Sequence, residues 1–398
     1  PPNPVNLYLY FRQKSRFFVA KGGLHILMEQ KEKIEDFFHE TRECHAALLM
    51  AALFFISYLL IRGSRAAANF VIQSITTPYK RMMGWLCDFA PFSVMELLTA
   101  VFILGALFFL VRGIVRTVRL PGKGIRVYKG AAGFLAAGLL VIDGYCWLWG
   151  LNYYGDSFSD LSGLEAALVS VEGLYETALY YAGMANSLSD EVTRDEEGVF
   201  AESIDAIFAA SDTVYTGLYE QYPFLDTPIR TPKRMLFSEL MSITGFTGVY
   251  FPFTSETNLN INAPACLLPS TIAHELAHQK NIAAEQEANF LAVRACLTCG
   301  NAVYGYSGAL LGYIHLGNAL YDADRALWEE VYGSLNDQVL ADLDANNAYW
   351  AAYEEKGTDA AGTVYEVFLQ TQGQALGMQS YGACVDLLVA DYLTNIRG

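Results

Sequence analysis

Three long apolar runs lie in the first part of the chain, at about residues 44–61, 94–111 and 130–151. Each approaches the roughly 20 residues that a helix needs to cross the hydrocarbon core of a bilayer. Further along, apolar positions recur at spacings of three and four, which predicts amphipathic helices. The pattern therefore predicts an N-terminal region of three transmembrane helices, followed by a mainly α-helical domain.

The apolar spacing predicts the individual elements of that second domain. Helices are expected over residues 162–182, 200–220, 233–243, 271–279, 283–297, 308–320, 324–345 and 382–393. Residues 248–253 and 258–261 instead predict a short strand pair, in which Pro252 belongs at an edge or a bulge. This small β element would precede the helix at 271, and its edge strand could bind an extended peptide by backbone pairing.

Composition supports the membrane prediction. Hydrophobic residues make up 53% of the 398 and charged residues only 17%, which is too apolar for a soluble enzyme of this length. Residues 1–150 hold 17 Lys and Arg against 9 Asp and Glu, so the chain totals of 26 and 42 leave 9 and 33 beyond residue 150. The basic excess suits membrane flanks and the acidic excess a separate domain; neither suggests nucleic acid as a partner.

The basic residues also predict a topology. The loop between the second and third apolar runs has no acidic residue and carries Arg112, Arg116, Arg119, Lys123, Arg126 and Lys129. The positive-inside rule places such a loop in the cytoplasm. Three buried helices of a large soluble core are the weaker alternative, because they would not explain the basic flanks.

This topology divides the chain into three parts. Residues 1–45 lack the apolar core of a signal peptide and would form a cytoplasmic segment. Residues 46–151 would be the transmembrane region in the lipid bilayer of the cytoplasmic membrane. Residues 152–398 would form an extracytoplasmic domain, and Trp149 and Tyr153 would lie at the membrane interface where the third helix emerges.

The stretch His274-Glu275-Leu276-Ala277-His278 carries the most specific chemistry. Residues four apart share a helix face, so both histidines could bind one zinc ion, with Glu275 beside it as general base. Pro269-Ser270-Thr271 offers a hydroxyl that could cap the helix. A surface helix with two histidines by chance is the weaker interpretation, since the chain has only six.

A third ligand is expected on the next helix. The pattern breaks at Gln279-Lys280-Asn281, and Asn tolerates the left-handed turn that would bring Glu285 back toward the histidines. Two histidines and one carboxylate leave a fourth position for water, as in catalytic zinc sites. We favour Glu285 over Glu287, because Asn289 lies one turn after it and could hydrogen-bond the far nitrogen of a ligand histidine.

Hydrolysis also needs a donor for the oxyanion of the tetrahedral intermediate. Tyr381 is our candidate, with Tyr306 and His315 as alternatives. Each could equally be a buried aromatic or satisfied polar residue.

Four cysteines lie in the second domain: Cys266, Cys296, Cys299 and Cys384. Outside the cytoplasm they could form disulfides, although the sequence does not determine the pairing. Cys296 and Cys299 have the spacing of a zinc knuckle, but a single pair of cysteines is weak evidence for a metal site. Buried thiols or a disulfide are favoured over a second metal site.

The chain resembles a bacterial family of membrane proteins of unknown function that carries a zinc-peptidase signature. The resemblance covers roughly residues 70–390. It rests on the run from His274 through Phe290, Pro91-Phe92-Ser93, Trp149-Gly150-Leu151-Asn152-Tyr153, Phe251-Pro252-Phe253, Tyr306-Ser307-Gly308 and Ser380-Tyr381.

Such proteins are similar to gluzincin peptidases, whose zincin-like domain this likeness implies. The spacing Glu285-x-x-Ala288-Asn289 is like the Glu-x-x-Ala-Asp of HtpX-like and CAAX prenyl endopeptidases. The resemblance implies that His274, His278 and Glu285 bind Zn²⁺ and that Glu275 is the base. The chain departs from it at Asn281, where the family usually has Gly, and at Asn289, where HtpX-like enzymes have Asp.

These observations predict a membrane-anchored zinc metallopeptidase acting on a protein or peptide substrate. One alternative is a zinc-binding sensor or scaffold at the cell surface without turnover, and another is a zinc amidase acting on cell-wall peptides. Proteolysis within the bilayer is less favoured, because the motif lies far past the last apolar run and is followed by polar Gln279 and Lys280. The sequence does not specify the substrate or the oligomeric state.

Overall fold

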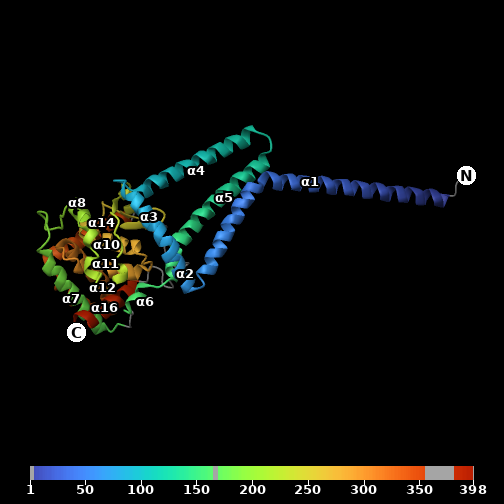
Figure 1. Cartoon of the computed structure of the whole chain (residues 1–398). Coiled ribbons are helices and arrows are strands. Elements are labelled where there is room, and N and C mark those ends of the chain that lie inside the picture. Colours follow the sequence, from blue (N-terminus) through green and yellow to red (C-terminus); the bar gives the residue numbers. More distant parts are fainter. Residues whose placement is uncertain (1–3, 165–168, 355–380, 398) are drawn as a thin grey trace. The chain divides into compact units, whose positions relative to one another are not determined.

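The computed structural model of the protein describes residues 4–164, 169–354 and 381–397, and helices dominate it (Figure 1). The mainly α fold class with a small β element is confirmed. The chain forms two compact units, described here one at a time. One comprises Pro1–Ser57 and Ile103–Asp143, and the other comprises Tyr58–Phe102 and Gly144–Gly398.

The three apolar runs form helices that are long and apolar enough to cross a membrane. These are the segment Met28–Ile61 of α1 (Pro4–Ile61), then α4 (Val94–Arg119) and α5 (Lys123–Leu148). The 26 residues of α4 give a length of about 39 Å, which exceeds the roughly 30 Å hydrocarbon core. None of its most apolar stretch is buried by protein. Such a surface is suited to lipid.

Within the first unit, α1 contacts the beginning of α5. The imidazole Nε2 of His45 is hydrogen-bonded to the hydroxyl of Tyr128 at 2.6 Å. The ring of Phe37 packs edge-on against Tyr128 with centroids 5.0 Å apart. The basic loop between α4 and α5 is a tight turn in which Gly122 takes a φ of 77°, a conformation that favours glycine.

Five helices form the centre of the second unit, and their apolar residues make one buried cluster. They are α7 (Val171–Ser189), α10 (Leu268–Gln279), α11 (Glu285–Thr298), α12 (Ala302–Ala323) and α16 (Tyr381–Asp391).

Two glycines let α12 approach its neighbours closely. A Cβ on Gly308 would lie 2.5 Å from the Cβ of Cys296 on α11, and a Cβ on Gly312 would lie 2.5 Å from the ring of Tyr181 on α7. There is no room for a side chain at either position. The close packing of α12 against both α11 and α7 therefore requires glycine at these positions.

Shorter elements complete this unit. They are α2 (Arg65–Val71), η1 (Ile72–Thr76), α3 (Thr77–Asp88), η2 (Gly150–Tyr154), α6 (Phe158–Ser162), α8 (Ile204–Ala209), η3 (Ser211–Thr213), η4 (Thr216–Leu218), η5 (Pro223–Leu225), α9 (Ser238–Ile243), η6 (Ala265–Leu267), α13 (Arg325–Tyr332), α14 (Asp337–Glu354) and η8 (Tyr392–Ile396). Residues 58–102, which the sequence analysis assigned to the transmembrane region, thus belong to the same compact unit as the C-terminal domain.

The sheet consists of β1 (Lys233–Arg234), β2 (Gly248–Phe251) and β3 (Glu256–Leu259) in the order β1-β3-β2. Strand β3 runs parallel to β1 and antiparallel to β2. The expected strand pair is confirmed, and β2 is an edge strand of this sheet. The helix expected from residue 233 is wrong over its first part, because β1 pairs with a strand distant in sequence and α9 begins only at Ser238.

Other helix boundaries also differ from the sequence pattern. The helix expected over 200–220 is the six-residue α8 followed by 3-10 turns, and the one over 324–345 breaks near Gly333 into α13 and α14. The helix expected from 162 begins at Val171, after a cap from Ser170; residues 165–168 lie outside the described residues. Apolar spacing continues across such breaks and does not reveal them.

Two carboxylates connect the beginning of α4 to the sheet region within the second unit. Glu256 on β3 accepts hydrogen bonds from the backbone N–H groups of Val94 at 3.0 Å and Met95 at 2.8 Å. Glu96 in turn accepts from the N–H groups of Leu236 at 2.9 Å and Phe237 at 2.8 Å. Charge-assisted bonds of this kind are among the stronger ones, and the first pair caps a helix N-terminus.

The close approach of α12 predicts an effect on stability. Gly312→Ala should destabilise the second unit by about 1–3 kcal/mol, because the added methyl overlaps the ring of Tyr181. Gly183→Ala on α7 is the control, since its Cβ meets nothing within 4 Å and alanine favours helix. Thermal unfolding of the detergent-purified protein should show a lower midpoint only for Gly312→Ala. Equal midpoints for the two variants would contradict the close packing.

Candidate metal centre

Helix α10 carries the two histidines, and it begins differently from the sequence expectation. The hydroxyls of Ser270 and Thr271 do not cap the helix; both donate to the carbonyl of Leu267 at 2.9 Å. The backbone N–H of Ser270 donates instead to the hydroxyl of Ser307 on α12, at 3.1 Å. A neighbouring helix therefore supplies the cap, and the apolar side of α10 is fully buried.

His274, His278 and Glu285 converge and could hold a metal ion. The Nε2 atom of His274 lies 3.2 Å from Oε2 of Glu285, and Nε2 of His278 lies 3.6 Å from Oε1. One ligand atom from each residue lies within 4.8 Å of the other two. Ligands bound about 2.0–2.2 Å from a tetrahedral zinc ion would be about 3.3 Å apart. The donor types and their spacing fit a single ion.

A left-handed turn brings Glu285 to the histidines, as the sequence predicted. Asn281 takes a φ of 74°. The N–H of Asn281 donates to the carbonyl of His278 at 3.0 Å, and that of Ile282 donates to Ala277 at 3.1 Å, which closes the end of α10. Helix α11 then starts at Glu285, on the side of the ligand histidines.

The other nitrogen of His278 is held by the backbone. Its Nδ1 lies 2.7 Å from the carbonyl oxygen of Ile282, which can only accept, so Nδ1 carries the hydrogen. Nε2 then faces Glu285. Burial acts to lower the pKa of His278, but the carboxylate of Glu285 outweighs it and raises this pKa to about 9. The arrangement attracts positive charge, either a proton or a metal cation.

Asn289 was predicted to orient a ligand histidine in this way. Its side chain makes no hydrogen bond with the described residues, and for His278 the structure supplies the Ile282 carbonyl instead. An orienting role for Asn289 toward His274 stays a prediction.

The choice between the two glutamates of α11 follows from their contacts. Glu287 accepts the backbone N–H groups of Phe158 and Ser159, both at 3.0 Å, and so caps α6. Glu285 faces the histidines. Burial acts to raise the pKa of Glu285, but the two histidines hold it well below its usual range. Glu285 is therefore ionised and placed as a ligand, while Glu287 stabilises a helix start.

Glu275 lies beside this cluster and is only 5% exposed. Burial raises the pKa of its carboxyl group, against smaller opposing effects of His274 and His278. Its Oε2 atom has no hydrogen-bond partner among the described residues. Strand β2 lies against it, and a Cβ on Gly248 would be 2.7 Å from Oε1 of Glu275. The carboxylate thus has one buried oxygen available to a water molecule or a substrate.

An aromatic cluster that the sequence analysis missed covers His278. The ring of Trp149 packs edge-on against the imidazole, with centroids 5.3 Å apart at an interplanar angle of 88°. Tyr250 on β2 lies 5.3 Å from the same indole, and Tyr153 packs against this cluster. Trp149 is buried in the protein, so its ring contacts the site and not solvent or lipid, and its position at the membrane interface stays a prediction. The signal that could have identified it is the Trp149 to Tyr153 segment of the family resemblance.

Among the possible oxyanion donors, the structure places His315 and Tyr153 near the cluster. Burial, with a smaller effect of the charge on His274, lowers the pKa of His315 to about 4. Burial and the charge of Glu285 raise the pKa of Tyr153, whose ring packs edge-on against Trp149 with centroids 6.3 Å apart. Tyr153 was not among the expected donors.

Tyr306, another of the expected donors, is held away from the cluster. The hydroxyl of Tyr306 donates to the buried carboxylate of Asp342, and its ring stacks on Phe200 at 5.9 Å. Tyr306 is thus used in a separate network. Tyr381 begins α16, but its side chain lies outside the described part of the chain.

The cysteines are free thiols. All seven lie in described segments, and no disulfide joins any of them. The thiol of Cys296 lies 3.9 Å from the carbonyl of Pro269, and that of Cys299 lies 3.2 Å from the carbonyl of Cys296. Burial raises the pKa of both thiols. The buried-thiol interpretation is confirmed for Cys296, while Cys299 is a half-buried free thiol.

Comparison of the sequence with known proteins identifies a family. A family model described as "Protein of unknown function (DUF3810)" matches residues 68–389. The chain belongs to the DUF3810 family. The matched residues begin in α2, end in α16 and include the entire candidate metal centre. No curated protein and no solved structure matches the chain.

The two glutamates of α11 provide a matched test of metal binding in this DUF3810 protein. Glu285→Gln should reduce bound metal strongly, because it removes the anionic ligand from the cluster. Glu287→Gln should retain metal, since that residue contacts only the start of α6 through the bonds described. Metal content per protein, measured by elemental mass spectrometry after purification in detergent, checks this. Loss of metal in Glu287→Gln but not in Glu285→Gln would reverse the assignment.

Proposed function

We propose that this chain is a membrane-anchored zinc metallopeptidase that hydrolyses peptide bonds. The observation that supports this most directly is the convergence of His274, His278 and Glu285 beside the buried carboxylate of Glu275. A purely structural zinc site has four protein ligands, whereas three ligands leave a position for water or substrate. A general base one residue after the first ligand matches the needs of hydrolysis.

The donor set favours zinc over other common cations. Two imidazole nitrogens and one carboxylate suit zinc, whereas magnesium and calcium prefer oxygen ligands. The Nδ1 of His278 is already held by the Ile282 carbonyl, which leaves Nε2 for the metal. When bound, zinc would polarise the substrate carbonyl and make a water molecule more acidic.

Glu275 would accept the proton from the attacking water and then deliver it to the leaving amine nitrogen. Its buried position raises its pKa, which helps it to hold the proton between these steps. The backbone of Tyr250 contacts its carboxylate and lowers the pKa slightly. This contact, together with the close approach of Gly248, holds the carboxylate in place.

Tyr153 is the donor we assign to the oxyanion. Burial raises the pKa of this hydroxyl, and Glu285 is close enough to raise it further. Its ring packs edge-on against Trp149, with centroids 6.3 Å apart. Burial keeps this hydroxyl protonated, as an oxyanion donor must be. Tyr381, the donor predicted from sequence, stays a prediction.

The edge strand β2 suggests how a peptide would bind. It pairs with β3 on one side, and Glu275 lies against it. An extended peptide added alongside such a strand would have its carbonyl groups presented to the site by backbone hydrogen bonds. This mode selects an extended protein or peptide segment and does not name its sequence. The positive-inside rule would place the site on the outer side of the membrane.

Glu275→Gln should bind metal normally but lose hydrolysis by about 10²-fold or more, because it removes the base and retains the three ligands. We would compare cell-surface proteomes of cells with wild-type protein and with this variant, after confirming equal metal content. Peptides with new termini that depend on wild-type Glu275 support the proposal. Bound zinc without any changed product would favour the sensor alternative, and lack of zinc would exclude both enzyme hypotheses.

The orientation of the chain in the membrane can be tested separately. A cysteine at Lys123, in the turn between α4 and α5, should be labelled only from the cytoplasmic side. A cysteine at Ser157, before α6, should be labelled by a membrane-impermeant maleimide from outside intact cells. The half-buried native Cys44 and Cys299 would be replaced by serine first. Labelling of both positions from one side would rule out three crossings.

A further inference from the structure

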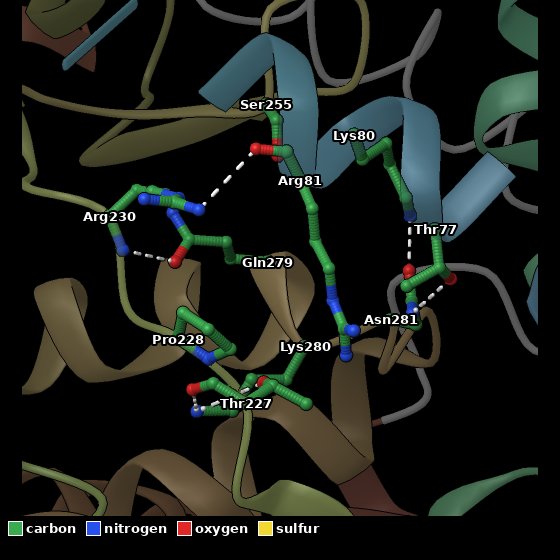
Figure 2. A pocket seen from close by; sticks show the side chains of 10 residues that line it. All are labelled: Thr77, Lys80, Arg81, Thr227, Pro228, Arg230, Ser255, Gln279, Lys280 and Asn281. Atoms are coloured by element: carbon green, nitrogen blue, oxygen red, sulfur yellow. Dashed lines mark hydrogen bonds between the residues drawn. The ribbon is translucent and has the colours of Figure 1, made fainter. Parts of the chain in front are cut away.

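A basic pocket lies between α3, residues 227–230 and the turn that follows α10 (Figure 2). It is partly open to solvent and has ten lining residues. Four of these are basic, namely Lys80, Arg81, Arg230 and Lys280, and none is Asp or Glu. Cations gathered in one partly enclosed space repel one another and attract an anion.

Protein groups already satisfy two of the four cations. The ammonium of Lys280 donates to the carbonyls of Leu225 at 2.8 Å and Thr227 at 2.9 Å, and the exposed Asp226 acts on its charge. Arg230 forms an ion pair with Asp88 at 3.3 Å. These two residues contribute positive potential but have few donors left.

Lys80 and Arg81 differ from them. Neither forms an ion pair with any described residue. The side chain of Lys80 is buried, donates to the amide oxygen of Asn281 and lies 5.5 Å from the centre of the Trp149 ring. Burial lowers the pKa of Lys80 to about 7. A buried ammonium without a carboxylate partner is stabilised by any anion that reaches it.

Gln279 provides an independent indication of a missing acceptor. Its Oε1 accepts the backbone N–H of Arg230 at 2.8 Å, which fixes the orientation of the amide. Its Nε2 is buried and has no hydrogen-bond partner within the described residues. Figure 2 shows the Arg81 side chain extending between Gln279 on one side and Asn281 on the other. A buried donor without a partner is uncommon and points to a group that binds there.

We propose that this pocket binds a phosphate-class oxyanion through Arg81, Lys80 and Gln279. The ammonium and the guanidinium come from consecutive residues of α3 and the amide N–H from the end of α10, and a tetrahedral oxyanion has enough acceptor oxygens to serve all three. The site is separate from the proposed hydrolysis and does not depend on it. The phosphate could be free in solution or belong to a lipid headgroup. The lipid source is suggested by exposed Trp85 on α3 and exposed Phe89 directly after it.

Binding would also affect the turn after α10. Lys80 donates to the side chain of Asn281, and the amide nitrogen of Asn281 donates to the hydroxyl of Thr77 at 3.0 Å. An anion on Lys80 would therefore strengthen the contact between α3 and this turn. We expect the ligand to stabilise the folded protein increasingly as its concentration rises above its Kd, with the logarithm of that concentration.

Thermal unfolding of the full, detergent-purified chain tests the pocket. One titration uses inorganic phosphate against sodium chloride of equal ionic strength, and another uses short-chain phosphatidylglycerol against a neutral detergent of equal chain length. Arg81→Gln is the test variant, because its side chain is exposed and its loss should not disturb folding. Arg325→Gln on α13 is the control, since that arginine is also exposed but does not line the pocket.

The unfolding midpoint of the wild type and of Arg325→Gln is expected to rise with the logarithm of ligand concentration, and in Arg81→Gln the same rise should need at least about tenfold more ligand. A response to inorganic phosphate identifies the free ion as a sufficient ligand, and a response to the lipid alone identifies the headgroup. No rise with either probe would overturn the proposal. An equal rise in Arg81→Gln would do the same, because it would reveal a general salt or lipid effect.

Discussion

The left-handed backbone at Asn281 determines the geometry of the candidate metal centre. It ends α10 directly after His278, turns the carbonyl of Ile282 onto the imidazole and starts α11 with Glu285 beside both histidines. Asparagine is one of the few residues other than glycine that adopts this conformation readily. Its side chain adds what glycine could not, because the amide group binds Thr77 and Lys80 of α3. The metal cluster and the basic pocket therefore share one turn.

Acidic residues hold much of the second unit together through backbone N–H groups. Glu256, Glu96 and Glu287 each accept two such groups from segments distant in sequence. Asp342 accepts the N–H of Phe200 and pairs with Arg194 at 3.1 Å. Ionised acceptors make stronger hydrogen bonds than neutral ones, and caps satisfy groups that helices leave unpaired. Part of the acidic excess of this region thus has a structural function.

Sequence reasoning predicted the parts of the site that depend on local spacing. The histidines four apart, the break at Asn281 and the position of Glu285 all lie within twelve consecutive residues, where helix geometry determines which side chains meet. Trp149 and Lys80 could not be found in this way. In the sequence, Trp149 has the features of an aromatic residue at a membrane interface, and Lys80 those of a basic residue that flanks a membrane helix. Both are buried by packing against residues more than a hundred positions away in the sequence. The short strand β1 was not predicted for the same reason, since its pairing partner β3 is distant in sequence.

Gly248 places a condition on how this family can vary. Any side chain at that position would meet the carboxylate of Glu275, so an inherited change there would displace this carboxylate even with His274, Glu275 and His278 intact. Under the proposed function, a family member with a residue other than glycine at the start of β2 would keep the metal cluster but lose hydrolysis.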